Sequence, residues 1–129
     1  MKIKVVESKS FKFIKVPEWE PYEGFTVAFP LTSKETEHMS VVMFKEDPGF
    51  SVEGTMSVEE IEYILEGSFK YTHKGKTFTA RRGDIVILSK GTKVIFSTDT
   101  GCECLAITYP HLTSEAVARA RVISSGKSR

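Results

Sequence analysis

The chain has 129 residues and a formal net charge of +1, from 18 basic and 17 acidic residues. This length predicts a single domain with a substantial core. The balanced charge argues against a nucleic-acid-binding or polybasic membrane-surface protein, and no apolar run approaches the roughly 20 residues of a membrane helix. The first residues lack the apolar stretch of a signal peptide, and two cysteines, Cys102 and Cys104, do not make a disulfide framework. We therefore expect a soluble cytoplasmic protein.

Short β-branched and aromatic runs, broken by Gly, Pro or Asp, make up most of the chain. In the first half they predict strands over residues 12–16, 24–29, 40–45, 50–57 and 60–65. In the second half they predict strands over 68–72, 77–80, 85–88, 93–97 and 103–109, with the first two paired as a hairpin across residues 73–76. Regular spacing of short strands and turns is typical of a β-sandwich or barrel.

The C-terminal segment contains the one helix candidate. Thr113 or Ser114 supplies an N-cap, and the helix would continue to Arg121, followed by a frayed tail over 124–129. Near the other end, Trp19 and Tyr22 could close a pocket mouth, but we expect them instead to pack the N-terminal arm on the barrel or on a second subunit.

Two spaced motifs resemble those of cupins. Glu60 and Gly67 match the Glu-x6-Gly half of the first cupin motif. Gly83 and Gly91 match the second motif, with Ser89 in its proline position, and together the matches cover roughly 39–110. The resemblance implies an all-β double-stranded β-helix, the cupin jelly-roll barrel, with a short C-terminal helix. Residues 1–129 would form one domain, with an N-terminal arm and strands over 1–38, a barrel core over 39–110, and a short helix and tail over 111–129.

Cupin metal sites use three histidines and one glutamate, and only the glutamate position is matched here, by Glu60. The histidine positions hold Glu53 and Thr55 with a four-residue gap, or Gly54 and Met56 with a three-residue gap, and then Val94. One carboxylate does not hold a transition metal tightly. We therefore expect a degenerate metal site, with no metal and no cofactor.

Within the cupins, the sequence is most similar to the ethanolamine-utilisation EutQ-type branch. The similarity is carried by residues 59–67, 80–86, 90–92, 96–98 and 105–110. It implies a role in ethanolamine catabolism, association with a bacterial microcompartment and an acetate-kinase-type activity. The sequence contains no Gly-rich loop of the P-loop kind, so the kinase expectation depends on the resemblance alone.

Alternate residues of a strand share a face, so Glu62 should face the barrel interior if Glu60 does. We expect these two glutamates to be catalytic. The expected ligand-binding residues are Glu53, Thr55, Thr92, Val94 and Phe96. Neighbouring carboxylates in a low dielectric cannot all ionise cheaply, so one should keep its proton. Such a pair suits acid–base chemistry or the binding of a small amine cation; alternatively, Glu53 or Glu62 turns outward or pairs with Lys or Arg.

Three functions remain open. The first is a metal-independent cupin that binds a small metabolite. The second is a metal-dependent enzyme with a rebuilt site of Glu53, Glu60 and His38, and the third is a non-catalytic scaffold or assembly protein. The resemblance also implies a homodimer, and the unpaired edge of an exposed early strand supports one.

Overall fold

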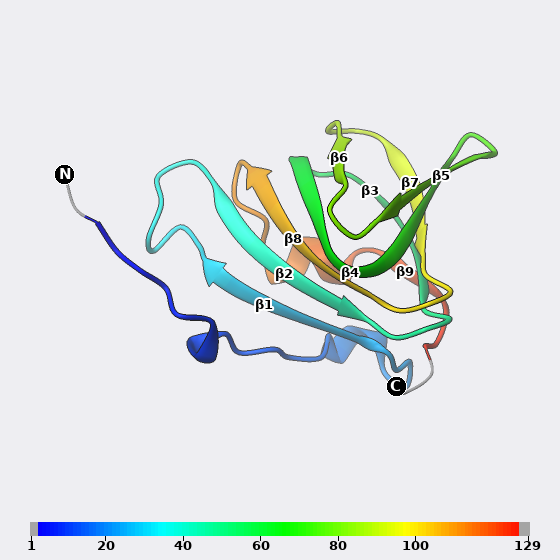
Figure 1. Ribbon diagram of the computed structural model, residues 1–129, viewed down its shortest axis with the longest axis horizontal. Helices are drawn as coiled ribbons and strands as arrows, with labels where there is room; N and C mark the ends of the chain where they lie inside the picture. The colour runs from blue at the N-terminus through cyan, green and yellow to red at the C-terminus, as the bar shows by residue number, and fades with distance from the viewer. Residues whose placement is uncertain (1–2, 127–129) are drawn as a thin grey trace.

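The computed structural model describes residues 3–126, which form a curled antiparallel sheet with one small helix (Figure 1). The strands are β1 (Phe25–Leu31), β2 (Ser40–Glu46), β3 (Ser51–Thr55), β4 (Glu59–His73), β5 (Lys76–Arg81), β6 (Ile85–Leu88), β7 (Lys93–Ser97), β8 (Cys102–Tyr109) and β9 (Arg121–Ser124). The helix α1 spans Ser114–Ala118, and two 3₁₀ turns, η1 (Ser8–Ser10) and η2 (Pro17–Trp19), lie in the N-terminal arm. This is the expected cupin jelly-roll architecture.

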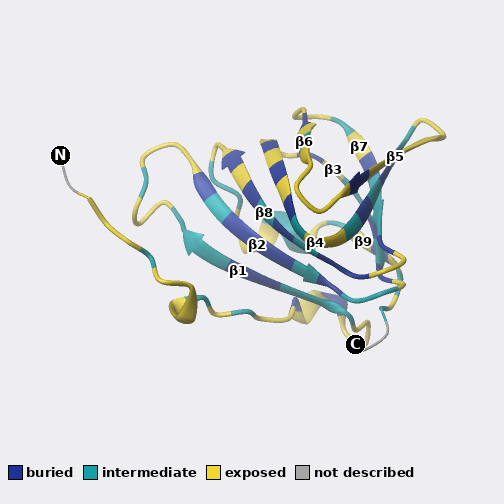
Figure 2. Ribbon diagram, viewed as in Figure 1, coloured by how far each residue is buried: buried dark blue, intermediate teal, exposed yellow. Residues whose placement is uncertain are grey.

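The strands form two walls that share β4. One wall has the order β1-β2-β8-β4, with β6 also paired to β4. The other has the order β4-β7-β3-β9, with β5 also paired to β4. Side chains at alternate positions of β4 and β8 face inward and are buried, with Glu60, Glu62 and Thr108 among them, and this alternation gives the striped pattern in Figure 2. The core therefore lies between the walls.

Residues 60–72 form one long strand, β4, and not the two separate strands predicted at 60–65 and 68–72. The Glu66-Gly67 step indicated a turn but is a bulge, because the register against β8 shifts between Ile64 and Glu66. Gly67 has φ +74°, a conformation in which side chains other than glycine are strained. The bulge lets β4 pair with β6 and β8 before it and with β5 and β7 after it.

Both ends of the chain differ from expectation. The predicted strand over 12–16 is reduced to one bridge, between Ile14 and Val27. The helix is shorter than predicted, and the residues after it form β9, which pairs with β3. Ser124 therefore belongs to a strand and not to a frayed tail, while residues 127–129 of that predicted tail lie outside the described residues. Across residues 3–126, no helix is long and apolar enough to cross a membrane.

Trp19 joins the two ends over the barrel. Its Nε1–H donates to the carbonyl oxygens of Ala118 at 3.2 Å and Ala120 at 3.0 Å. Its ring packs edge-on against Phe25, with ring centroids 4.9 Å apart. The predicted packing of the arm on the barrel is thus confirmed for Trp19, whereas Tyr22 is exposed.

Candidate functional site

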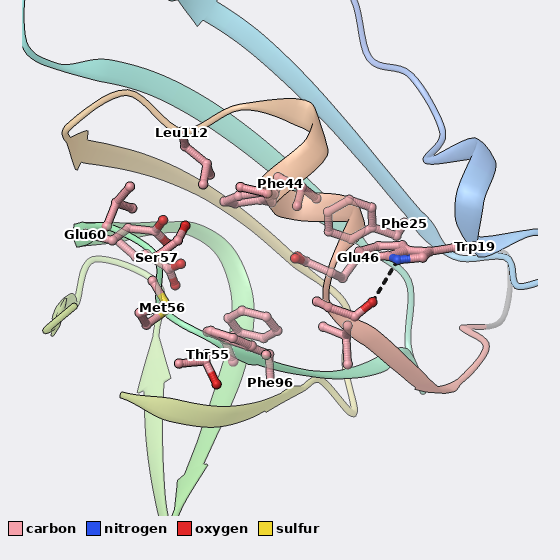
Figure 3. Close-up of a pocket in the computed structure, with 18 residues that line it drawn as sticks. Trp19, Phe25, Phe44, Glu46, Thr55, Met56, Ser57, Glu60, Phe96 and Leu112 are labelled. Carbon is pink, nitrogen blue, oxygen red and sulfur yellow. Dashed lines mark hydrogen bonds between the residues drawn. The ribbon is translucent and has the colours of Figure 1, made fainter. Parts of the chain in front are cut away.

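A cavity of about 100 Å³ lies inside the barrel, between the two walls and beneath α1 (Figure 3). Five aromatic residues line this cavity: Trp19, Phe25, Phe44, Phe69 and Phe96. Leu112, Val117 and two alanines close it from the C-terminal side, and exposed Thr55 and Ser57 mark its rim. The volume is well below the ~300–1,000 Å³ of pockets for drug-sized ligands, so an occupant would be small.

Three buried carboxylates also line this cavity: Glu46, Glu60 and Glu62. Glu60 and Glu62 lie two residues apart on β4 and therefore point to the same side, while Glu46 comes from the end of β2. In Figure 3, Glu60 lies beside Ser57, and Glu46 lies near Phe25 and Trp19. None of the described residues lining the cavity is Lys, Arg or His. The lining is therefore both acidic and aromatic.

The carboxyl group of Glu60 is held in its neutral form. Burial raises its pKa well above the usual range, and a hydrogen bond with Glu62 and the negative charges of Glu62 and Glu46 act in the same direction. Glu60 therefore holds its proton to a higher pH than an ordinary glutamate does, and in that neutral form it donates to Glu62.

Tyr71 fixes the position of Glu62. Its phenol donates to Glu62 Oε1 at 2.6 Å, and burial together with that carboxylate raises the pKa of Tyr71, so the phenol stays protonated. Tyr71 also packs edge-on against Phe69 and Phe96. The result is a chain of hydrogen bonds in which Glu62 accepts from both Tyr71 and Glu60.

The cysteines lie deeper in the same interior. Cys102 and Cys104 are free and fully buried, as expected for small apolar residues. A hydrogen bond with Cys102, followed by burial and the Glu62 and Glu46 charges, raises the pKa of the Cys104 thiol. The Cys104 thiol is therefore kept in the unreactive neutral form.

The structure separates the predicted site residues into two groups. Glu60, Glu62 and Phe96 meet at the cavity, as does Thr55, whose residue is nonetheless exposed at the rim. Glu53 does not line the cavity, which corrects the expectation that it faces inward. Its carboxylate pairs with Arg121 on the neighbouring β9, at 3.0 Å, the outward alternative left open above.

Two further predicted residues are near the cavity but do not line it. Val94 is buried in the core cluster beside the cavity. Thr92 is half-buried in the turn before β7, where its carbonyl accepts from the backbone N–H of Met56 at 2.9 Å. The inward positions of β3 are Val52 and Gly54, so the three-residue gap is the correct alignment of the cupin motif.

The residues at the cupin metal positions do not fit a metal ion. With that alignment the positions hold Gly54, Met56, Glu60 and Val94, and only Glu60 has a ligand oxygen. Within residues 3–126, no group of three or more His, Cys, Asp or Glu is arranged to hold a metal. His38 is exposed in the loop before β2, 3.6 Å from Glu37, so the rebuilt site of Glu53, Glu60 and His38 is not formed.

Sequence reasoning missed Glu46, Tyr71 and three aromatic residues of the cavity wall, Phe25, Phe44 and Phe69. Glu46 shares its strand face with Phe44 and Val42, but residues 41 and 43 are apolar as well, so alternation did not reveal which face is inward. Tyr71 lies nine residues from Glu62 on the same strand, and only the bulge at Gly67 brings their side chains together.

Comparison with known proteins identifies similar chains. The family described as "Ethanolamine utilisation protein EutQ" matches residues 1–115. "Acetate kinase EutQ" of Salmonella typhimurium is 29% identical over 109 residues, which is 84% of this chain and 46% of that protein. The Escherichia coli protein of the same name is 28% identical over the same shares. The chain thus spans about half the length of the curated relatives it matches.

Solved structures agree with the fold. A putative ethanolamine utilization protein Q from Salmonella typhimurium superimposes with a TM-score of 0.77 at 26% identity, covering 85% of this chain and 88% of that one. Ectoine synthase from P. lautus superimposes with a TM-score of 0.79 at 16% identity, covering 99% and 94%. At that identity the second likeness concerns the barrel alone.

Proposed function

Because the chain belongs to the ethanolamine utilisation protein EutQ family, we propose that its barrel binds a small amine-bearing metabolite of ethanolamine utilisation. The observation that carries this proposal is the buried, hydrogen-bonded pair Glu60 and Glu62 in an aromatic cavity without basic residues among its described lining. The proposed binding needs no metal, since only Glu60 among the residues at the cupin metal positions offers a ligand oxygen.

The proposed chemistry is an exchange of a cation for a proton. An ammonium group entering beside Glu62 supplies the positive charge that the carboxylates lack, so Glu60 ionises and its proton is released to solvent. The aromatic lining, which includes Phe44, Phe69 and Phe96, would add the cation–π attraction that aromatic rings offer to ammonium groups. The small volume limits the ligand to a few non-hydrogen atoms, and Glu60 and Glu62 are the candidate acid–base pair for any reaction at it.

The relatives named acetate kinase suggest a different ligand, and the cavity argues against it. Acetate and phosphate groups are anions, and the negative charges of Glu62 and Glu46 in the cavity lining would repel them. A nucleotide is also too large for about 100 Å³. We therefore assign neither acetate nor a phosphoryl donor to this cavity.

Trp19 provides a direct test, because it is the only tryptophan of the sequence and lines the cavity. Ethanolamine hydrochloride should change its fluorescence saturably, while sodium acetate at equal ionic strength should not. Calorimetric titration in two buffers of different ionisation enthalpy should show proton release of up to one per site. Glu62→Gln should weaken binding at least tenfold, since it removes the resident negative charge.

Two further variants sharpen this experiment. Glu60→Gln should abolish the proton release, because no titratable group remains at that position. Glu53→Gln is the matched control, since Glu53 pairs with Arg121 outside the cavity and its loss should leave binding unchanged. Saturable binding of acetate, or ethanolamine binding that Glu62→Gln does not weaken, would refute the proposal.

A further inference from the structure

The charged residues are unevenly distributed along the chain, although their total is nearly balanced. Residues 16–66 contain 12 acidic and 2 basic residues, whereas residues 70–95 contain 7 basic residues and 1 acidic residue. Six of these seven cations are exposed and form no ion pair within residues 3–126: Lys74, Lys76, Arg81, Arg82, Lys90 and Lys93. The β4–β5 hairpin and the turns beside it therefore form a basic surface, which favours an anionic partner.

The strand β5 is an open edge of this surface. Among the described strands it pairs with β4 alone, and the hairpin projects from the barrel (Figure 1). The backbone N–H of Arg81 donates to Asp84 Oδ2 at 2.8 Å, and the Arg81 carbonyl accepts from the N–H of Asp84, so these backbone groups face away from β4. Backbone groups alternate in direction along an antiparallel strand, so those of Thr77 and Thr79 face the same open edge. Such an edge can accept a further strand.

The two faces of β5 differ in their chemistry, because side chains alternate between them. Thr79 and Arg81 lie on the outer face, where Lys70 of β4 is the residue opposite Thr79. Phe78 lies on the other face and is 51% exposed, and the Nζ of Lys76 lies 5.0 Å from its ring centroid. An added strand would therefore place every second side chain beside hydroxyl and cationic groups, and the others beside an aromatic ring.

We propose that the open edge of β5 binds an extended acidic segment of a partner protein, which adds to the sheet as a further strand. Backbone hydrogen bonds with Thr77 and Thr79 set the register of this segment. Carboxylates at alternate positions pair with Arg81 and with the lysines of the hairpin tip, and apolar residues at the intervening positions pack against Phe78. The recognised segment thus alternates acidic and apolar residues.

Other anionic partners fit this surface less well. The outer face that β4 and β5 share contains no aromatic ring on which nucleic-acid bases could stack, since its residues are Ser68, Lys70, Thr72, Thr77, Thr79 and Arg81. The hairpin tip over residues 73–77 contains no large apolar side chain that could enter a lipid surface. No residue of β5 lines the cavity, so this site does not depend on the proposed amine binding.

Fluorescence anisotropy of a labelled eight-residue peptide, Glu-Val repeated four times with both ends capped, tests this site on the full chain. Binding should be saturable at about 50 mM salt and about fivefold weaker at about 500 mM, because salt screens the paired charges. Arg81→Glu should weaken binding at least tenfold. Lys34→Glu is the matched control, since Lys34 is exposed in the loop before β2 and the substitution changes the net charge equally, and it should leave binding unchanged.

Thr79→Pro separates strand addition from charge attraction. Proline at this position removes an N–H that faces the open edge and keeps the pairing with β4, so binding should weaken at least tenfold with an unchanged circular dichroism spectrum. A peptide N-methylated at its glutamates makes the same test on wild type, in case Thr79→Pro does not fold, and it should not bind. Amide hydrogen exchange of Thr77 and Thr79 should slow when wild type is saturated with the unmethylated peptide.

Three results would overturn the proposal. The first is the absence of saturable peptide binding, or binding that Arg81→Glu does not weaken. The second is equal binding of the N-methylated peptide, which would show charge attraction without an added strand. The third is tighter binding of an oligothymidylate or of phosphatidylserine vesicles through Arg81, which would assign the surface to a nucleic acid or a membrane.

Discussion

At the residue scale, Gly67 is constrained by two features of the fold: its backbone conformation and its close approach to Gly101. A Cβ added at Gly67 would lie 1.9 Å from the carbonyl oxygen of Gly101, in addition to the strain of φ +74°. A residue with a Cβ at Gly91 would be strained by the φ of +89°, but that Cβ would contact nothing within 4 Å. Substitution of Gly91 therefore tests backbone strain alone, whereas substitution of Gly67 tests backbone strain together with close packing.

We expect Gly91→Ala to destabilise the protein by about 1–2 kcal/mol, the cost of left-handed backbone for a residue with a Cβ. Gly67→Ala should cost about 2 kcal/mol more, because Gly101 on the way into β8 must move as well. Urea unfolding of the two variants and wild type, at one protein concentration, measures both values. Equal losses in the two variants would show that the approach to Gly101 relaxes at no cost.

At the element scale, the N-terminal arm and the α1–β9 segment form one closure over the cavity, joined by Trp19. Trp19→Phe removes the donor to Ala118 and Ala120 and leaves a gap beside Phe25, so we expect a loss of about 2–3 kcal/mol. Hydrogen exchange should accelerate selectively in residues 112–124. Tyr22→Phe, at an exposed neighbouring aromatic, should change neither quantity. Uniform acceleration over the whole barrel would contradict a local closure.

Some strands of the fold could be predicted from the sequence and others could not. Short strands with Gly and Pro between them, such as β2, β6 and β7, lie close to their predicted ranges because local pattern and turn chemistry agree there. A Glu-Gly step is typical of either a turn or a bulge, so the sequence does not distinguish the bulge inside β4 from a break between two strands. The strand β9 and the reduced 12–16 segment depend on which partner edges are available, and this is a property of the assembled barrel.

The residues of the candidate site also divide into those that could be predicted from the sequence and those that could not. Glu60 and Glu62 follow from strand alternation once the motif is aligned, so their position in the cavity could be predicted. Glu53 and Glu46 could not, because the first depends on a one-residue choice of gap and the second on the inward face of an apolar strand. Tyr71 required the geometry of the bulge, which no local pattern encodes.

At the scale of the whole molecule, the neutral Glu60 links folding to pH. Its pKa is raised in the folded state, by burial first and by Glu62 and Glu46 next, from a usual value of 4.5. Below that value both states hold the proton, and the contribution of Glu60 to stability is fully present. As pH rises above 4.5, the unfolded chain loses this proton and the folded chain keeps it, so stability falls until the raised folded pKa is passed.

We therefore expect wild-type stability to decline as pH rises from about 4.5 toward the raised pKa of Glu60 in the folded state, by up to about 1.4 kcal/mol per pH unit from this group alone. Glu60→Gln keeps a neutral side chain of similar shape and cannot lose a proton, so its stability should fall less steeply and overtake that of wild type as pH rises. Urea unfolding of both proteins at several pH values, with protein concentration fixed because a dimer would make stability depend on it, measures the difference. Parallel stability curves for the two proteins would show that Glu60 is ionised in the folded barrel, and the proton that the amine proposal releases would then have no source.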